Sequence, residues 1–523
     1  MTSYDILLLG ATGYTGRLIL RYLHAHPQHE HTHHRASSVP ERSQGPGSPL
    51  RSTSTSTSTS TWTSPSASTS TSSSTSTSTS KATFTFAIAA RSQARLDATT
   101  RGLGIDCAAS GVHTLLVDVT NAEQLERAVR GARVVINAVG PFWRWGTAVV
   151  RACVRCGTHY VDISGELPWI RSIITRFDYA ATKSRTIVVP ACGMDSIPSD
   201  YSVYLSKKTL DRFRAFQAFR QMASSYSMES STSAYDIEGA GLSGGSWGTI
   251  LAWMEEVPRE ELECMWNPCV LSPVQPPASV QMPPRVRVLY RMPYAPHIVG
   301  GFFSMSLSNI PIVERTWGLL EHQALSTSAG TGHSTLESPR YGPEFRYDEF
   351  VRAGGVVAAV MSSVGMLAAL WCLRMFSWAR WLFRRFIPRP GEGPADNSLG
   401  KGYLEVTNVT VASPSTLSSE TSPAKHDPIV VKSRIRGHGD PGYYLTSVMV
   451  AESALSIVFS YASLPPLAQG GGVLTPVTAF GDVLIERLTG CGLFEFTSEV
   501  LQGGDRDNDI MTGMDGSAED LLS

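Results

Sequence analysis

The chain has 523 residues, 42% of them hydrophobic and 17% charged, and its formal net charge at pH 7 is −1. Such a length accommodates two to four domains of roughly 100–200 residues each. Because 44 Lys and Arg balance 45 Asp and Glu, there is no basic excess to neutralise phosphates, which argues against nucleic-acid binding. Eight cysteines in so long a chain do not form a disulfide framework, which favours a reducing compartment.

An apolar run at residues 4–10 predicts a buried strand that ends in a glycine turn. Because this strand starts so early, we expect no secretory signal peptide, and therefore a protein that is not secreted. Strand and helix then alternate, which indicates βαβ units and a parallel sheet. We predict an α/β fold in which residues 1–200 form the first domain. The further predicted strands lie at 84–90, 114–119, 133–139, 159–164 and 186–191, with helices such as 122–130 and 147–155 between them.

Residues 26–81 interrupt this alternation. From Ser52 to Ser80 every residue except three is Ser or Thr, and six histidines lie just upstream. The tract has no apolar surface to offset the entropy of ordering it, so we predict a disordered insertion. The histidines have no Cys or carboxylate partners at useful spacing, and we therefore interpret them as part of a loop and predict no metal site.

Beyond residue 200 the pattern becomes mixed. We predict an α+β substrate domain formed by residues 201–350 and 429–500, joined through a Ser/Thr/Pro-rich linker at 391–428. Residues 501–523 are acidic and glycine-rich, which predicts a disordered tail.

Residues 351–390 contain a stretch without charge, 354–373, followed by tryptophans and arginines. Its 20 residues match the roughly 20 that cross a bilayer, and a Trp/Arg border is typical of a membrane interface. Three glycines and two serines leave it weakly apolar, so a buried core helix is the alternative. A single crossing would separate the final folded stretch from the first domain. We therefore favour a hydrophobic membrane-associating segment that inserts monotopically or as a hairpin.

A glycine-rich turn directly follows the first predicted strand and opens a helix. The first glycine permits the tight turn, the second lets the backbone approach a pyrophosphate, and the third lets the helix pack closely on the strand. The helix N-terminus then offers N–H donors and a positive dipole end to phosphates. We predict a Rossmann dinucleotide site at Gly10, Thr12, Gly13, Tyr14, Thr15 and Gly16.

The end of the second predicted strand indicates which dinucleotide binds. An NAD site requires an acidic residue there, whereas this chain has Arg91 and Ser92, which suit a 2′-phosphate. The alternative is that Arg91 is a solvated charge at a strand end. We predict NADP as the cofactor, with Asp118 beside the adenine and Asn137 and Gly140 beside the middle of the molecule.

Three carboxylates follow predicted strands at the edge where open α/β sheets bind ligands: Asp162, Glu166 and Asp195. A carboxyl group whose pKa is raised by burial can serve as a proton donor, which makes all three catalytic candidates. The alternative is that they cap helices and hold loops. A Gly/Ser-rich turn at 243–248 precedes a helix, and its N–H groups are further candidates for holding a substrate carbonyl or carboxylate.

Two other patterns have competing interpretations. Tyr179 and Lys183 lie one helical turn apart, like the proton-donor pair of short-chain dehydrogenases, and Ser164 would complete that triad. Such a pair is common by chance, so we favour the carboxylates. Cys153 and Cys156 form a CxxC inside a Val-rich helical run without a second pair at zinc spacing, which predicts packing rather than metal or redox chemistry.

Taken together, these motifs resemble the saccharopine dehydrogenase-like oxidoreductase family and are close to the trans-acting enoyl reductases. The matching segments are the glycine turn, 89–92, 135–142, 157–166, 192–200, 439–443 and 471–482. The resemblance covers most of the chain outside the Ser/Thr-rich tracts and the tail. It implies a Rossmann domain, a second α+β domain that closes over the nicotinamide, and hydride transfer.

The resemblance also implies association with lipid droplets or membranes. From it and from the residues, we expect an NADP-dependent oxidoreductase that reduces a C=C or C=O of a small, lipid-like substrate. We expect it on a lipid droplet or on the cytosolic face of an organelle membrane. The rival interpretations are a non-catalytic dinucleotide-binding scaffold on droplets and a soluble saccharopine-type reductase.

Overall fold

The computed structural model describes residues 4–30, 82–219, 226–331, 340–389, 391–414 and 428–502. The predicted disorder of 31–81 and of 503–523 lies outside the described residues. The insertion was predicted to begin at residue 26, but residues 26–30 are part of the fold. His29 forms an isolated parallel bridge with Phe84 and is buried.

The first sheet has seven strands in the order β13-β6-β5-β4-β1-β2-β3, and every pairing in it is parallel. This confirms the predicted α/β fold with a parallel sheet. The strands are β1 (Tyr4–Leu9), β2 (Phe86–Ala90), β3 (His113–Leu116), β4 (Ala132–Asn137), β5 (His159–Asp162), β6 (Ile187–Val189) and β13 (Gly472–Val473).

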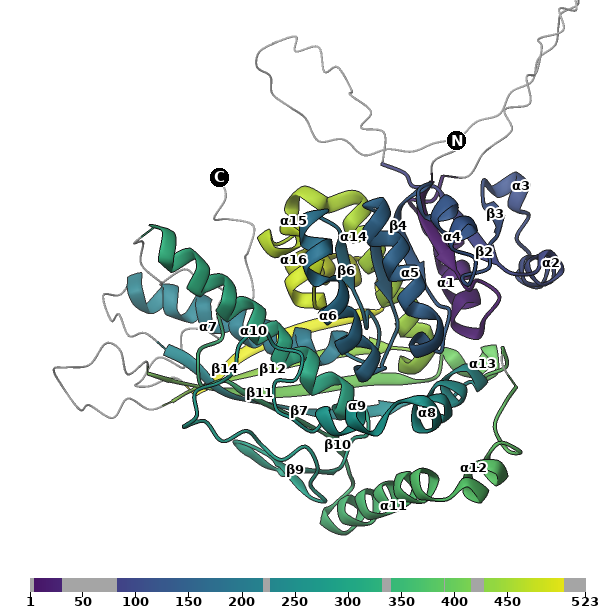
Figure 1. The fold of residues 1–523 in the computed structure, drawn as a ribbon. Coiled ribbons are helices and arrows are strands. Elements are labelled where there is room, and N and C mark those ends of the chain that lie inside the picture. The colour runs from purple at the N-terminus through teal and green to yellow at the C-terminus, as the bar shows by residue number, and fades with distance from the viewer. Residues whose placement is uncertain are drawn as a thin grey trace, which may run out of the picture.

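Helices cover both faces of this sheet (Figure 1). Successive side chains of a strand point to opposite faces, so Ile6 and Leu8 join a core with α1 and α14, while Leu7 and Leu9 join a core with α4, α5 and α6. Burial on both faces is why β1 is a continuous apolar run. The helices around this sheet are α1 (Tyr14–Ala25), α2 (Gln93–Gly102), α3 (Cys107–Ser110), α4 (Ala122–Val129), α5 (Phe142–Cys156), α6 (Leu167–Lys183), α14 (Thr446–Ser460), α15 (Pro466–Gly470) and α16 (Pro476–Gly490).

The second sheet also has seven strands, in the order β14-β12-β11-β7-β10-β9-β8. Only β10 and β7 pair in parallel, so the sheet is mixed. Helices α7 (Ile197–Phe219) and α10 (Ser306–Thr331) pack against it. Its strands are β7 (Tyr226–Glu238), β8 (Tyr290–Met292), β9 (Ala295–Gly301), β10 (Arg346–Arg352), β11 (Tyr403–Pro414), β12 (Ile429–His438) and β14 (Phe494–Gln502).

Two predicted domain boundaries are wrong. The segment 391–428, predicted as a linker, contains the helix α13 (Asp396–Leu399) and the strand β11, which lies between β7 and β12. The Ser, Thr and Pro residues that indicated a linker lie in 412–428, whereas most of β11 precedes them and pairs with a strand on each side. The substrate domain was predicted to include all of 429–500, but α14, β13 and α16 return to the first sheet and cover it.

Helices α11 (Val356–Met375) and α12 (Ser377–Phe383) lie along the lower edge of the molecule in Figure 1, where α11 packs against β9 of the second sheet. Two helices of the described part of the chain are long and apolar enough to cross a membrane. The one at Pro441–Ser463 is 78% buried over its apolar window and forms part of the core, whereas Val356–Met375 is only 11% buried. The alternative of a buried core helix at 354–373 is therefore wrong.

Candidate active site

A cavity of about 1390 Å³ runs along the carboxyl edge of the first sheet and continues beneath α8 (Gly244–Glu256) and α11. In the sheet register Leu9 is level with Ala89 and with Asn137, and Asn137 is level with Asp162. The loops that follow four parallel strands therefore all open on one edge. The volume exceeds the roughly 300–1,000 Å³ of a single small-molecule site, which leaves room for a dinucleotide and a second molecule.

The glycine turn forms one end of this cavity. Gly10 has φ +82°, and a Cβ there would lie 2.8 Å from the carbonyl oxygen of Ala138. A Cβ on Gly16 would lie 2.1 Å from the carbonyl oxygen of Gly10, so Gly16 lies beneath the turn and permits its close packing rather than lining the cavity. Gly13 is the N-cap of α1 and has no side-chain cap, which suits a phosphate at that helix end. The predicted residues that line the cavity here are Gly10, Thr12, Gly13, Tyr14 and Thr15.

Two guanidinium groups lie where the adenosine 2′-phosphate would bind. Arg91 and Arg95 are exposed and line the cavity, and no ion pair of Arg91 is found within the described ranges. Ser92 lies just behind them, where its Oγ accepts a hydrogen bond from the Arg95 N–H at 3.4 Å and caps α2. Asp118 lines the cavity opposite, and hydrogen bonds from Thr120, with a smaller effect of Arg91, lower the pKa of its carboxyl. The residues present fit NADP.

Asn137 and Asp162 lie beneath the site and do not line the cavity. The Asn137 Nδ2 donates to the Tyr160 hydroxyl at 3.0 Å, and that hydroxyl donates to Asp162 Oδ2 at 2.6 Å. The other oxygen of Asp162 accepts from the backbone N–H groups of Ser164 and Ala191, both at 2.9 Å. Burial raises the pKa of Asp162 to about 6. This network fixes the ends of β4, β5 and β6, and its geometry matches the loop-holding alternative for Asp162.

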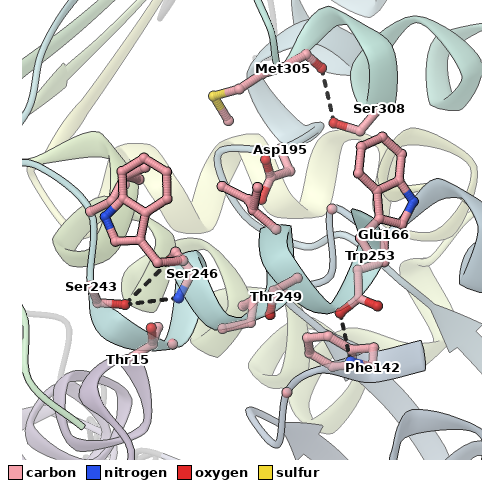
Figure 2. Close-up of a pocket in the computed structure, with 18 of the residues that line it drawn as sticks. Thr15, Phe142, Glu166, Asp195, Ser243, Ser246, Thr249, Trp253, Met305 and Ser308 are labelled. Carbon is pink, nitrogen blue, oxygen red and sulfur yellow. Dashed lines mark hydrogen bonds between the residues drawn. The ribbon is translucent and has the colours of Figure 1, made fainter. Parts of the chain in front are cut away.

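Glu166 and Asp195 both line the cavity but differ in their partners (Figure 2). The two oxygens of Glu166 accept the N–H groups of Phe142 at 2.6 Å and Trp143 at 2.8 Å, so this carboxylate caps α5, and burial raises its pKa to about 7. The Asp195 carboxyl has no hydrogen-bond partner among the described residues, and burial raises its pKa to about 6. It lies against Gly165, where an added Cβ would be 3.0 Å from its Cγ.

The turn at 243–248 forms the start of α8, which covers the cavity. The Ser243 N–H donates to the Tyr443 hydroxyl at 2.5 Å, the Gly244 N–H to the Glu392 carbonyl at 3.0 Å, and the Ser246 N–H to the Ser243 Oγ at 3.3 Å. Three donors that were candidates for holding a substrate carbonyl or carboxylate are therefore already paired within the chain.

The end of the cavity away from the glycine turn is apolar. Its lining comes from α8, from the segment before α10, and from α11. The buried Trp253 Nε1 has no hydrogen-bond partner in the described part of the chain and is a free donor at this end. The apolar side chains here include Trp253, Met254, Leu262, Met265, Phe302, Phe303, Met366, Leu367, Leu370 and Leu373.

Comparison with known proteins gives the family of the first domain. Residues 71–189 match the family described as "Saccharopine dehydrogenase NADP binding domain". Over these residues the chain is similar to the NADP-binding domain of saccharopine dehydrogenases. This confirms both the predicted family resemblance and the predicted cofactor, NADP. The match extends from the Ser/Thr-rich tract to the end of β6. The glycine turn lies outside the matched residues, so its assignment rests on its geometry.

The curated relatives are similar over most of their length. The chain is 29% identical over 417 residues to a candidate trans-acting enoyl reductase of Mycobacterium tuberculosis, covering 77% of this chain and 88% of that protein. It is 27% identical over 420 residues to a trans-acting enoyl reductase of Mycobacterium ulcerans, with 77% and 88% covered. A solved saccharopine dehydrogenase (L-Glu forming) of Saccharomyces cerevisiae aligns over 96% of this chain and 100% of that one, at 12% identity and a TM-score of 0.43.

The segment around 439–443 contributes to the site. In the sequence it was noted only as part of the resemblance to the family and was not predicted as a site. Asp440 is buried, and its two oxygens accept the N–H groups of Ala240 at 2.7 Å and Tyr443 at 2.8 Å. Asp440 and Tyr443 both line the cavity from the π-helical turn η3 (Pro441–Leu445). No local pattern in the amino-acid sequence indicates that this turn would meet the glycine turn. Arg95 was also missed, although its place in the first turn of the helix that follows Arg91 could have indicated it.

The alternative catalytic pairs lie away from the cavity. Tyr179 is 76% exposed on α6, the Lys183 Nζ lies 5.5 Å from the centre of its ring, and neither lines the cavity. The Ser164 Oγ accepts the Glu166 N–H at 3.1 Å instead. Cys153 is buried in the core against α4 and α6, and both cysteines of the CxxC are free thiols.

Proposed function

We propose that this protein is an NADP-dependent reductase that acts on a C=C or C=O group of a lipid-like substrate, at the surface of a membrane or a lipid droplet. The observation that carries this proposal is one continuous cavity. It joins the glycine turn and Arg91 at one end to an apolar chamber beneath α8 and α11 at the other.

The chemistry requires little of the protein beyond alignment, exclusion of water and a proton. Bound NADPH, held by the glycine turn and Arg91, would supply a hydride for the β-carbon of a conjugated C=C or for the carbon of a C=O. The proton then goes to the α-carbon or to the oxygen, and Asp195 is placed to donate it. Its carboxyl faces the cavity without a competing partner, between the dinucleotide end and the apolar end. Glu166 positions α5 beside it.

The character of the substrate is inferred from the lining. The apolar chamber offers few polar groups that would recognise an amino acid, which favours a long hydrocarbon chain over a saccharopine-type substrate. The names of the curated relatives, trans-acting enoyl reductases, agree with reduction of a conjugated C=C. The exposed apolar helix α11 supports a place at a lipid surface.

The test uses the purified full chain, NADPH and a panel of substrates, with loss of NADPH absorbance as the readout. The panel comprises long-chain and short-chain enoyl thioesters, a long-chain ketone, and an amino acid paired with an aldehyde. We expect oxidation with a long-chain substrate and weaker oxidation with its short-chain analogue. A preference for the amino acid pair would contradict the proposal. Tight NADPH binding without oxidation across the panel would favour the scaffold interpretation instead.

A further inference from the structure

Helices α11 and α12 expose a large apolar surface that carries only positive charge. Five arginines and no Asp or Glu lie between Ala353 and Gly391. Isolated exposed apolar side chains are ordinary, but a contiguous group of this size marks an interaction surface. The most exposed members are Val357 at 72%, Met361 at 70%, Trp378 at 61%, Trp381 at 61% and Phe386 at 79%.

The first half of α11 is fixed to the second sheet. The buried Ser363 hydroxyl accepts the Phe302 N–H at 2.7 Å and lies 2.9 Å from the carbonyl oxygen of Val288. A Cβ on Gly301 would lie 2.7 Å from the carbonyl oxygen of Ala359, so β9 and α11 pack closely at this point. This end of the segment is therefore anchored by buried contacts.

The other end is held by solvent-accessible ion pairs. The Glu255 carboxylate, in the last turn of α8, receives the Arg380 Nε at 3.1 Å and the Arg384 Nη2 at 2.6 Å. Next to them the Phe383 ring packs edge-on against Trp247, with centroids 4.6 Å apart. Exposed ion pairs are weak and are screened by salt, so this end can be released more easily than the anchored one.

These same contacts close the apolar chamber. Trp247 and Phe383, which meet beside the ion pairs, both line the cavity, and so do Leu370 and Leu373 on α11. Displacing α12 from α8 would therefore uncover the part of the cavity that we assign to the substrate.

We infer that α11 and α12 form a lid that opens when anionic lipid headgroups replace Glu255 as the partners of Arg380 and Arg384. This inference rests on the proposed function and adds how the substrate reaches the cavity. Apolar side chains flanked by Trp and Arg suit the depth at which a helix lies in a lipid interface. The surplus of arginines selects phosphate-bearing, negatively charged lipid, because guanidinium groups bind phosphate in a bidentate manner.

The chain offers a matched pair of variants for the test. Glu255→Gln removes the carboxylate of the lid contact. Glu256→Gln removes the same charge from the next residue, whose partner is Arg144 on α5. The full chain is floated with vesicles of phosphatidylcholine alone or mixed with phosphatidylserine. Hydrogen exchange is followed in residues 244–256 and 356–383.

We expect the wild-type chain to bind the phosphatidylserine vesicles at least several-fold more tightly than pure phosphatidylcholine, with faster exchange in α8 on binding. Glu255→Gln should bind several-fold more tightly still and show the faster α8 exchange without vesicles. Glu256→Gln should behave as the wild-type chain does in vesicle binding. Equal binding to both vesicles, or equal behaviour of the two variants, would overturn the inference.

A failure of the lid inference can be distinguished from a failure of the proposed function. If anionic vesicles release the lid and no lipid-like substrate is reduced, the reductase proposal fails and the lid stands. If long-chain substrates are reduced with the same dependence on vesicles in the Glu255→Gln and wild-type chains, the lid fails and the reductase proposal stands.

Discussion

The ring of Tyr14 packs edge-on against the ring of Tyr443, with centroids 4.9 Å apart and planes at 86°. Tyr14 opens α1, the helix whose N-terminus we assign to the cofactor phosphates, and Tyr443 lies in η3 near the other end of the chain. The Tyr443 hydroxyl also accepts the Ser243 N–H at the start of α8. One side chain thus joins the dinucleotide site, the C-terminal turn and the cover of the cavity.

Tyr443→Phe should lower the free energy of unfolding by about 1–3 kcal/mol, because it leaves the buried Ser243 N–H without an acceptor. It should also weaken NADPH binding, since α8 and α1 then lose a shared contact. Urea unfolding and calorimetry measure the two effects. Tyr444→Phe is the control, because no hydrogen bond of the Tyr444 hydroxyl is found in the described part of the chain. Equal losses in both variants would argue against this role.

Arg91→Ala should weaken NADPH binding by roughly 10- to 100-fold, as expected from about 1.5–3 kcal/mol for a charge-assisted hydrogen bond, and should leave NADH binding unchanged. Arg95→Ala should have an effect of the same kind, since both guanidinium groups line that end of the cavity. Calorimetric titration with each dinucleotide checks this. Arg101→Ala, on the same helix α2 but outside the cavity, should have no effect. A parallel loss of NADPH and NADH affinity would show that Arg91 does not bind the 2′-phosphate.

Asp195→Asn should lower the rate of reduction by about 10²- to 10⁴-fold while NADPH still binds, because the amide cannot donate the proton. The pKa of Asp195 is raised to about 6, so the acid is protonated below that pH. In the wild-type chain kcat/KM should therefore fall as the pH rises above about 6, and this dependence should disappear in the variant. Tyr179→Phe, on the exposed face of α6, should retain nearly full activity. A thousandfold loss in Tyr179→Phe would instead support the short-chain dehydrogenase pair.

Gly16→Ala and Gly102→Ala should change stability in opposite directions. A Cβ on Gly16 would overlap the carbonyl oxygen of Gly10, so overpacking should destabilise the fold by about 1–3 kcal/mol and abolish NADPH binding. A Cβ on Gly102, at the end of α2, meets nothing within 4 Å and should stabilise by up to about 1 kcal/mol. Thermal unfolding with and without NADPH distinguishes them. A Gly16→Ala chain that binds NADPH normally would contradict the close packing of the turn.

Glu349 should make stability depend on pH. This fully buried carboxyl accepts hydrogen bonds from Ser199, Tyr347 and Asn309, and burial raises its pKa from 4.5 to about 7. Between those values the folded chain holds a proton that the unfolded chain has lost. The free energy of unfolding should therefore fall as the pH rises from about 4.5 to 7, by up to roughly 3 kcal/mol.

Glu349→Gln removes this titration, so its stability should depend less steeply on pH over that range. Urea unfolding at several pH values measures the difference between the two chains. The slope that remains reports the other carboxyls whose pKa values burial raises, among them Asp162, Glu166, Asp195 and Asp200. Parallel curves for the variant and the wild-type chain would show that Glu349 does not titrate in this range.

The sequence predicts the elements whose signal is local. Strands β1, β2, β4 and β6 are short apolar runs because both faces of the sheet are covered there, whereas β3, at the edge of the sheet, is only partly buried. The glycine turn is equally local, since Gly10 and Gly16 contact each other within one loop. The choice of NADP required only Arg91 at a strand end and the absence of a carboxylate there.

Tertiary contacts decided the rest. Composition marked 391–428 as a linker, but pairing with β7 and β12 makes residues 403–414 an internal strand. The three carboxylates Asp162, Glu166 and Asp195 could not be ranked in advance. Which of them keeps a carboxyl without a hydrogen-bond partner depends on donors that the fold brings from the segment after β6 and from α5. The amino-acid sequence alone thus determined the α/β class and the dinucleotide site, whose contacts are short-range. Only the three-dimensional structure singled out Asp195 as the candidate acid, the C-terminal turn and the proposed lid, because their partners are distant in the chain.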